Sequence, residues 1–268
     1  MVRSLLCIDK IDVVICTING QKAVDHCYEN IKRAGIPLNN LYVDNGYPLS
    51  YARWRVWQKV TTPWFVSLDD DVNLAEGWFQ QLSSKIDENT IAVEGILNEN
   101  MIRNEGTRNY FRVIEPSDKY DPVKKVYTLP RGKRGFVLDT ILKTSVFQKW
   151  KPIHWVEELE ELQIIDFLKG VHGYKEKIEG DWLRVITAGS HPGNWKRSAL
   201  AGGHGYRENY PPLKIILMVF WMTGVIPYHV IKKDFKNATQ SYLIVKGILE
   251  KKNPRFTQHW DTPFPKKG

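Results

Sequence analysis

Residues 64–71 read Trp-Phe-Val-Ser-Leu-Asp-Asp-Asp, an apolar run that ends in three adjacent carboxylates. The run is typical of a short buried strand, because β-branched and aromatic residues lie between Pro63 and an acidic turn. Neighbouring carboxylates repel one another unless a cation or hydrogen-bond donors lie between them. A divalent cation is the simplest partner, since carboxylate oxygens suit Mg²⁺ or Mn²⁺. The alternative is a solvated acidic turn that caps a following helix, with Asp71 or Asn73 near its first turn.

Two further strand ends precede this stretch. Residues 11–17 predict a strand, and the helical spacing of apolar residues within 21–34 predicts a helix. Residues 41–43 predict a second strand, and 49–60 predict a second helix. This alternation indicates an α/β protein with a mostly parallel sheet and right-handed crossovers. Ligands gather at the carboxyl ends of such strands, so we expect these polar residues at one edge: Thr17 and Asn19, Asp44 and Asn45, and Asp69 to Asp71.

The order of these motifs is similar to that of a known family. Thr17-x-Asn19, Val43-Asp44-Asn45-Gly46, Tyr51-Ala52-Arg53 and the run ending at Asp71 follow one another as in the nucleotide-sugar half of family 2 glycosyltransferases. The resemblance covers roughly the first two-thirds of the chain. It implies a GT-A fold, which is a Rossmann-like, mostly parallel sheet flanked by helices. It also implies inverting transfer of a sugar from a nucleotide-diphosphate donor, with Mn²⁺ or Mg²⁺ held by the so-called DxD motif.

The resemblance assigns a role to each matching position. Thr17 and Asn19 would line the nucleotide pocket, although Asn19-Gly20-Gln21 stands where the family more often has an aromatic-Asn pair. Asp44 would hydrogen-bond the base, with Arg53 close to it. Asp69 would face the ribose or the metal, Asp70 would contact the donor, and Asp71 would bind the metal. Each position also has an ordinary interpretation. The first two strand ends could be plain turns, and Arg53 could be one charge on an exposed helix.

A basic segment and an acidic segment follow in the second half of the chain. Residues 129–138 form a basic glycine turn that resembles the family's segment beside the transferred sugar, which implicates Gly132 and Arg134; a solvated basic loop is the alternative. Residues 157–162 read Glu-Glu-Leu-Glu-Glu-Leu and lead towards Gly173-Tyr174. In the family an acidic pair begins such a helix, and its second member is the catalytic base. The count back from Gly173 favours Glu160 and Glu161, with Glu161 as the base.

That register has alternatives. Glu157 and Glu158 are the other acidic pair in the segment. Acids at the start of a helix also simply favour its macrodipole. Elsewhere, the sequence predicts a helix that begins at Leu74, and strands at 91–96 and 182–188. His191 follows the last of these strands and matches a further metal ligand in some members of the family. Its imidazole would favour Mn²⁺ over Mg²⁺, and a surface histidine is the alternative.

Composition limits the class of partner and the compartment. The 268 residues carry a formal charge of +8, which favours a polyanionic partner such as nucleic acid, an anionic membrane or a phosphorylated small molecule. The basic residues are dispersed and no recognised RNA motif is present, so we do not expect a nucleic acid. Three cysteines without Cys-x-x-Cys spacing indicate reduced thiols, and residues 1–10 are too short an apolar run for a secretory signal. These features predict a cytoplasmic location.

The C-terminal region differs in composition from the rest. We expect a glycosyltransferase domain over 1–210 and a helical segment over 211–268. The uncharged stretch 215–228 is shorter than the roughly 20 residues that span a bilayer, and lysines follow it. It predicts a peripheral, monotopic attachment to the inner face of the cell membrane, which would present the site to a lipid-linked or membrane-borne hydroxyl acceptor. A buried packing helix or an oligomer contact is the alternative.

Two rival functions remain open from the sequence. A nucleotidyltransferase of similar fold would also use carboxylates and a metal at the edge of a sheet. It usually carries a glycine- and lysine-rich phosphate loop after the first strand, and residues 17–21 lack one. A basic module that binds membranes or nucleic acid is the rival from a different class.

Overall fold

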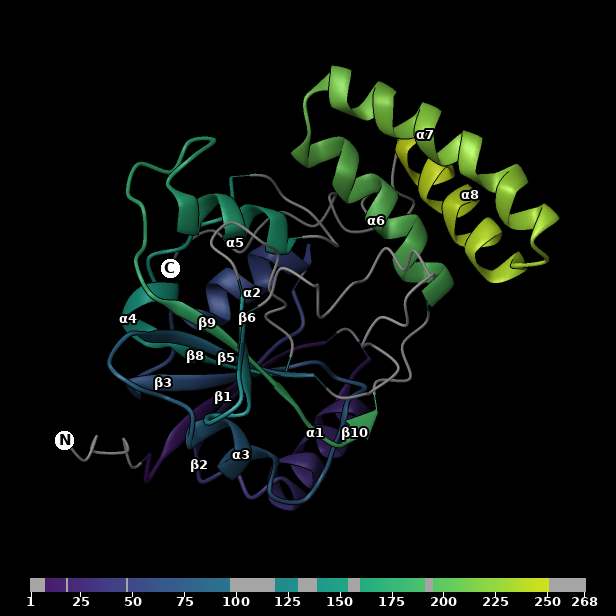
Figure 1. The fold of residues 1–268 in the computed structure, drawn as a ribbon. Coiled ribbons are helices and arrows are strands. Elements are labelled where there is room, and N and C mark those ends of the chain that lie inside the picture. The colour runs from purple at the N-terminus through teal and green to yellow at the C-terminus, as the bar shows by residue number, and fades with distance from the viewer. Residues whose placement is uncertain are drawn as a thin grey trace. The chain divides into compact units, whose positions relative to one another are not determined.

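The computed structural model describes seven stretches of the chain, shown as coloured ribbon in Figure 1: residues 8–17, 19–46, 48–96, 119–129, 139–153, 160–190 and 195–250. The chain divides into two compact units. The first holds residues 1–46, 52–153 and 161–192, and the second holds 47–51, 154–160 and 193–268. The second unit includes the helix Trp195–Asn209, so this helix groups with the C-terminal segment and not with the sheet.

The first unit is built on an eight-stranded sheet with the order β2-β1-β3-β8-β5-β9-β7-β6. Its strands are β1 (Ile11–Cys16), β2 (Leu38–Asp44), β3 (Trp64–Leu68), β5 (Thr90–Ile96), β6 (Lys119–Asp121), β7 (Val126–Thr128), β8 (Thr140–Lys143) and β9 (Asp181–Ile186). A separate pair joins β4 (Asn73–Leu74) to β10 (Gly189–Ser190). The helices that lie wholly or mostly in this unit are α1 (Gln21–Arg33), α2 (Leu49–Trp57), α3 (Trp78–Ser83), α4 (Thr144–Phe147) and α5 (Glu160–Lys169).

The sheet is mixed in direction. β1 runs parallel to both β2 and β3, and β5 runs parallel to β9. β8 lies between β3 and β5 and is antiparallel to both, and β7 is antiparallel to β9. The expected α/β class, with a sheet flanked by helices and an apolar helix near the C-terminus, is therefore confirmed. The reversal of β8 also places its first residues at the edge where β3 and β5 end.

Helices lie on both faces of the sheet (Figure 1), and an apolar cluster fills the layer on each face. Along β1, Val13 and Ile15 face the cluster that includes residues of α1 and α3, whereas Val14 faces the cluster with residues of α2, α4 and α5. This alternation follows from the period of two along a strand. Burial on both sides explains why the strands read as nearly continuous apolar runs.

The predicted helix from Leu74 is wrong at its start. Leu74 lies in β4, and α3 begins at Trp78 after Gly77, whose φ is 73°. The reason is that two side chains of α1 hold the backbone of Leu74 in place. Its N–H donates to Asn30 Oδ1 at 2.8 Å, and its carbonyl accepts from Arg33 Nε at 2.7 Å. The N–H and carbonyl groups of Leu74 therefore bind side chains of α1 and do not form helical hydrogen bonds.

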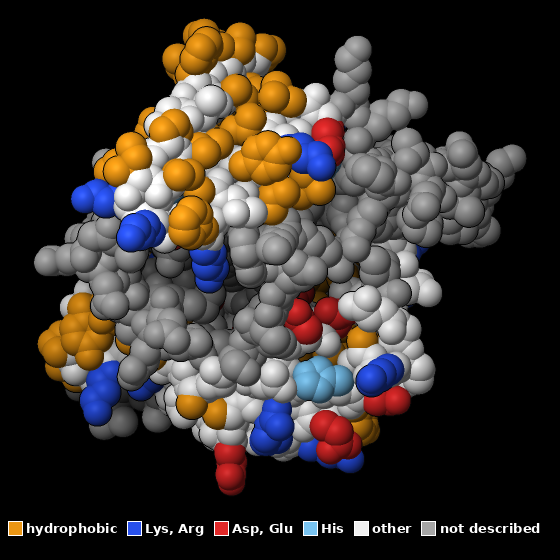
Figure 2. Space-filling model, turned by 90° about the vertical axis from the view of Figure 1, so that its right-hand side faces the viewer, with side chains coloured by type: hydrophobic (Ala, Val, Ile, Leu, Met, Phe, Trp, Pro, Cys, Tyr) orange, Lys and Arg blue, Asp and Glu red, His pale blue; other side chains and the backbone are white. Residues whose placement is uncertain are grey.

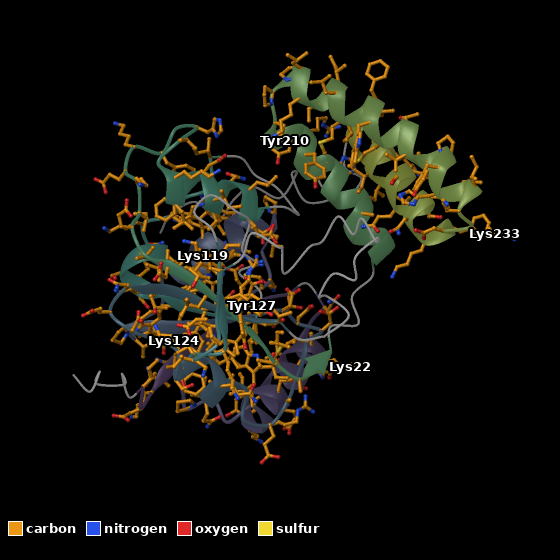
Figure 3. All side chains as sticks on the ribbon, viewed as in Figure 1. Lys22, Lys119, Lys124, Tyr127, Tyr210 and Lys233 are labelled. Carbon is orange, nitrogen blue, oxygen red and sulfur yellow. The ribbon has the colours of Figure 1, made fainter. Side chains whose placement is uncertain are left out.

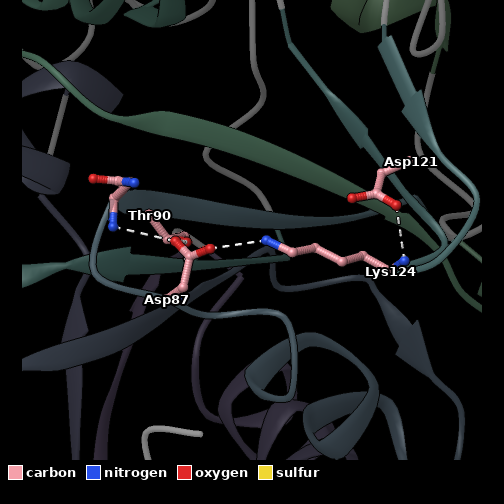
Figure 4. A network of polar contacts seen from close by, with 5 residues as sticks. Asp87, Thr90, Asp121 and Lys124 are labelled. Carbon is pink, nitrogen blue, oxygen red and sulfur yellow. Dashed lines mark hydrogen bonds and ion pairs between the residues drawn. The ribbon is translucent and has the colours of Figure 1, made fainter. Parts of the chain in front are cut away.

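An ion pair ties the β6–β7 hairpin to the start of β5 (Figure 4). Lys124 Nζ donates to Asp87 Oδ2 at 2.8 Å, and the hydroxyl of Thr90 donates to the other oxygen of Asp87 at 2.8 Å. The backbone N–H of Lys124 donates to Asp121 Oδ1 at 3.0 Å. This network fixes the hairpin at the end of the sheet that lies opposite the strand ends described below.

In the described residues of the second unit, 195–250 fold into the helices α6 (Trp195–Asn209), α7 (Pro212–Ile231) and α8 (Phe235–Leu249). The sequence analysis did not anticipate α6. α6 and α8 approach closely at two glycines: a Cβ on Gly203 would lie 2.2 Å from the carbonyl oxygen of Ile244, and one on Gly247 would lie 2.1 Å from that of Leu200. Only glycine permits this spacing between the two backbones. In the described part of the chain, α7 is the helix long and apolar enough to cross a membrane.

Candidate functional site

Three parallel strands end side by side in the first unit. Cys16 pairs with Asp44, and Ile15 pairs with Leu68, so the residues that follow β1 and β3 lie at one edge together with the end of β2. The backbone N–H of Thr17 donates to the carbonyl oxygen of Asp44 at 3.0 Å. The structure thus brings the three predicted strand ends together.

The middle acid of the triplet is held by the end of β1. Thr17 Oγ1 and Asn19 Nδ2 both donate to Asp70 Oδ2, the latter at 2.6 Å. Thr17 Oγ1 also accepts from the backbone N–H of Asn19 at 3.0 Å. Thr17 and Asn19 were predicted to line a nucleotide pocket. Here their side chains orient a carboxylate of the acidic turn.

One face of α1 holds the backbone of the acidic turn. His26 Nε2 lies 2.8 Å from the carbonyl oxygen of Val72, and Asn30 and Arg33 bind the backbone of Leu74. Asn30 is 1% exposed. The sequence analysis missed these three residues. The available signal was their spacing of four and three, which puts three polar side chains on one face of a helix.

The charges of the turn act on a buried thiol. Cys27 is fully buried, and its Sγ lies 3.6 Å from the carbonyl oxygen of Asp69. Burial, the largest cause, and the charges of Asp70, Asp69, Asp139 and Asp71, in that order, together raise the pKa of Cys27 to about 12. Four carboxylates therefore lie close enough to act on one side chain.

Asp139 is an acid that sequence reasoning missed. It directly precedes β8, is 4% exposed and has a φ of 52°, in the left-handed region. Its carbonyl oxygen accepts from the backbone N–H of Gly95 at 3.0 Å. A non-glycine residue in this region often occurs at a functional site. In a wholly parallel sheet, the start of β8 would lie at the opposite edge from the acidic turn. Asp139 lies near the acidic turn only because β8 runs antiparallel to β3 and β5.

The two arginines of α2 take different positions. Arg55, and not Arg53, pairs with Asp44: both guanidinium contacts are made, with Nε 2.6 Å from Oδ2. The N–H of Gly46 also donates to Asp44 at 2.7 Å. Arg53 is 2% exposed and donates from Nη1 to Ser67 Oγ at 3.1 Å, within the layer between α2 and β3. Arg55 was not anticipated, and its bidentate pairing is the stronger form of arginine–carboxylate contact.

The predicted acidic pair is buried. Glu160 is the first residue of α5 and Glu161 the second, and they are 2% and 5% exposed. Acids that only complement a helix dipole usually remain in solvent. Gln163 accepts from the N–H of Ile153 at 2.8 Å, which attaches the first turn of α5 to the preceding chain.

The end of α5 is attached to the same preceding segment. Tyr174 Oη donates to the carbonyl oxygen of Lys151 at 2.8 Å, and its ring packs against Phe167. Burial raises the pKa of the Tyr174 phenol above its ordinary value. The predicted Gly173-Tyr174 turn thus follows α5, which ends at Lys169. Five of the predicted site residues or alternatives lie outside the described residues: Gly132, Arg134, Glu157, Glu158 and His191.

The carboxylates near Cys27 have oxygen atoms of the kind that bind hard divalent cations. Among the described residues, no three His, Cys, Asp or Glu side chains are arranged as a ready-made metal cage. Mg²⁺ is commonly held by one or two carboxylates together with substrate phosphates, so carboxylates at a strand end fit such an ion. The β4–β10 pairing puts Ser190, the neighbour of His191 in sequence, opposite Asn73, two residues after Asp71.

Comparisons with known proteins assign no family to this arrangement. A scan of family models finds no match to the chain, and no curated protein matches it. The functional assignment therefore rests on the residues and contacts of this chain.

Proposed function

We propose that the chain is a metal-dependent, inverting glycosyltransferase with a GT-A form of the α/β fold, which uses a nucleotide-diphosphate sugar as donor. The observation that carries the proposal is the anchoring of Asp70 by Thr17 and Asn19, because it joins two separate parts of the resembling motif in one contact. Asp44, from the third part, lies at the end of the neighbouring strand.

In this proposal the donor lies over the strand ends. Asp69 and Asp71 hold Mn²⁺ or Mg²⁺, with His191 as a further ligand, and Asp70 stays oriented by its two donors. The ion, when bound, neutralises charge on the diphosphate. The base contacts Asp44 and Arg55 together. Arg55 is included because its guanidinium binds both carboxylate oxygens of Asp44 and therefore lies beside that side chain. Arg53 supports this region from within the core, through Ser67.

The residues of α5 supply the acceptor side. Glu161 takes the proton of the acceptor hydroxyl while that oxygen bonds to the anomeric carbon. The bond between the anomeric carbon and the diphosphate oxygen breaks, and the nucleoside diphosphate leaves from the opposite face. Glu160 precedes the base, and we assign the contacts with the transferred sugar to Gly132 and Arg134 from the sequence resemblance alone. The burial of Glu161 excludes bulk water, which would otherwise compete with the acceptor.

A donor-binding and turnover assay tests the proposal. The purified chain is screened with UDP-, GDP- and dTDP-sugars, with and without Mn²⁺, by thermal shift. A donor at a hundredfold excess over its Kd stabilises the folded state by about 2.7 kcal/mol. We expect one donor class to raise the melting temperature only with the metal. Asp71→Asn should remove that metal-dependent rise and lower turnover by about 10²-fold or more.

Two matched controls sharpen the assay. Asp181→Asn changes an exposed carboxylate at the start of β9 and should leave both readouts unchanged. Glu161→Gln should keep donor binding and abolish transfer, whereas Glu176→Gln, at an exposed position, should affect neither. Full turnover in Asp71→Asn, or no stabilisation by any donor with Mn²⁺, contradicts the proposal.

A further inference from the structure

Helix α7 exposes an apolar face along its whole length. Its exposed apolar side chains are 46% to 78% accessible: Leu213, Ile216, Leu217, Phe220, Trp221, Tyr228, Val230 and Ile231. Most recur at steps of three or four, which puts them on one face. Figure 2 shows hydrophobic side chains gathered over this part of the molecule. A core helix would be mostly buried, whereas 17% of the most apolar window of α7 is buried.

Helix α8 also carries exposed apolar side chains. Phe235, Tyr242 and Leu249 are 63%, 55% and 65% exposed and recur every seven residues, on one face of the helix. The opposite side of α8 is buried through Ile244, Gly247 and Ile248. The α7–α8 hairpin therefore has a packed inner side and an apolar outer side. We refer to the exposed apolar residues of the two helices as the outer face.

The charges around the outer face are basic. Helix α7 contains no Asp or Glu, and Lys232, Lys233 and Lys236 are exposed where α7 passes into α8. Asp234, the acid in this turn, accepts from the N–H and the side-chain amide of Asn237 and lies 3.4 Å from His229. Figure 3 labels Tyr210, just before α7, and Lys233, just after it, at the two ends of the helix. An apolar face with lysines beside it matches an anionic lipid surface.

The packing of α7 decides how it would meet a membrane. Twenty residues give a helix about 30 Å long, enough to cross the hydrocarbon core by length. However, Met222 and His229 of α7 are buried on its inner side, and α8 packs against α7. A spanning α7 would carry α8 into the bilayer, and α8 has Lys236, Gln240 and Lys246 within fifteen residues. Charged side chains at the bilayer centre are costly.

We propose that the outer face of the α7–α8 hairpin binds an anionic membrane surface, with both helices lying in the plane of the interface. The apolar side chains enter the boundary between headgroups and acyl chains, and the lysines contact the headgroups. This inference goes beyond the proposed reaction and does not depend on it. Where both hold, the acceptor is lipid-linked or membrane-borne.

Vesicle flotation tests the binding. The full-length chain is mixed with vesicles of phosphatidylcholine alone or with one quarter phosphatidylglycerol. We expect it to float with the anionic vesicles, and to float less as salt rises. Phe220→Glu, at a side chain 74% exposed, should weaken binding at least about tenfold. Val123→Glu alters an apolar residue 90% exposed in the first unit and should bind like the wild type.

Probe depth separates the interfacial arrangement from a spanning one. An environment-sensitive fluorophore is attached at Leu213→Cys, Phe220→Cys or Ile231→Cys, with Cys7 and Cys16 replaced by serine. Quenching by lipids brominated at different depths should place all three probes at the same shallow depth. A probe at 220 near the bilayer centre, with the others at the surfaces, would show a spanning helix and overturn the proposal.

Two other results also overturn it. One is equal flotation of the wild type and Phe220→Glu. The other is a lipid-independent dimer, measured by light scattering, that Phe220→Glu dissociates while neither protein floats; the outer face would then join two copies of the chain. Donor binding in the thermal-shift assay is unaffected by these outcomes, so this inference and the proposed reaction fail separately.

Discussion

Carboxylates have different surroundings at the two ends of the central strands. At the start of β1, Asp12 is fully buried and accepts six hydrogen bonds, two from Asn40 and the others from Asn39, Thr61 and Thr62. At the other end, Asp69, Asp70, Asp71 and Asp139 all lie close enough to Cys27 to raise its pKa. One end surrounds a single acid with neutral donors, and the other gathers several acids.

The difference separates a structural carboxylate from a candidate functional group. The donors of Asp12 come from the start of β2 and from the turn before β3, so this one side chain joins three strands. Each hydrogen bond to a charged group contributes roughly 1.5–3 kcal/mol when its partner is present. Adjacent acids at the opposite end repel one another, and a bound cation relieves that repulsion. The contrast predicts stability effects at one end and activity effects at the other.

The largest expected effect on stability comes from Asp12. Asp12→Ala leaves the partly buried backbone N–H groups of Asn40, Thr61 and Thr62 without their acceptor. We expect a loss of about 3 kcal/mol or more in the free energy of unfolding, measured by urea denaturation. Asp181→Asn, at the exposed start of β9, is the control. A loss no larger than that of the control would remove the contrast between the two ends.

Acid should weaken the protein through the same residue. Burial by itself raises the pKa of Asp12, but hydrogen bonds from Thr61, Asn39 and Thr62 outweigh it, so the folded-state pKa is lower than the ordinary value. The native state then binds fewer protons than the unfolded state. The contribution of Asp12 to stability is fully present above its unfolded-state pKa, about 3.9, and is lost as the pH falls through its folded-state pKa.

Urea denaturation between pH 6 and pH 3 measures this effect. The stability of the wild type should fall with acid, and Asp12→Asn should show a flatter dependence because residue 12 no longer titrates. Asp87, whose pKa is lowered because its bonds with Lys124 and Thr90 outweigh its burial, accounts for part of the remaining slope. Identical slopes in wild type and Asp12→Asn would refute the role given to Asp12.

The smallest effect is chemical and leaves the fold unchanged. At pH 8, a thiol whose pKa is about 12 carries about 10³-fold less thiolate than an ordinary cysteine. We expect iodoacetamide to modify the half-buried Cys16 in the native protein and to spare the fully buried Cys27. Mass spectrometry after unfolding in urea should find both cysteines modified. Equal rates at both sites in the native protein would contradict the position assigned to Cys27 beneath the acids.

Local patterns predicted much of the first unit. The strand expected at Trp64–Leu68 has those bounds, because an apolar run between a proline and charged residues has few other conformations. The convergence of Thr17, Asp44 and Asp69 was also predicted, since it follows from parallel strands alone. The helix from Leu74 failed because the backbone of that residue binds side chains of α1, which no local pattern reveals.

Other parts of the site depend on distant chain segments. Arg55 and not Arg53 reaches Asp44, although both are basic residues of one short helix. Their two-residue separation points them in different directions on α2. Asp139 joins the acidic group because β8 runs against its neighbours. Strand direction is a property of the whole sheet, so periodicity within the segment could not supply it.

By itself, the sequence determined the α/β class, the acidic strand end and the apolar C-terminal helix, because these depend on composition and on periods of two and 3.6 residues. Only the tertiary structure decided which side chains hold the acidic turn, which arginine meets Asp44, and that the acidic pair of α5 is buried. Those features arise from contacts between segments far apart in the chain, where packing and hydrogen-bond satisfaction select among locally equivalent residues.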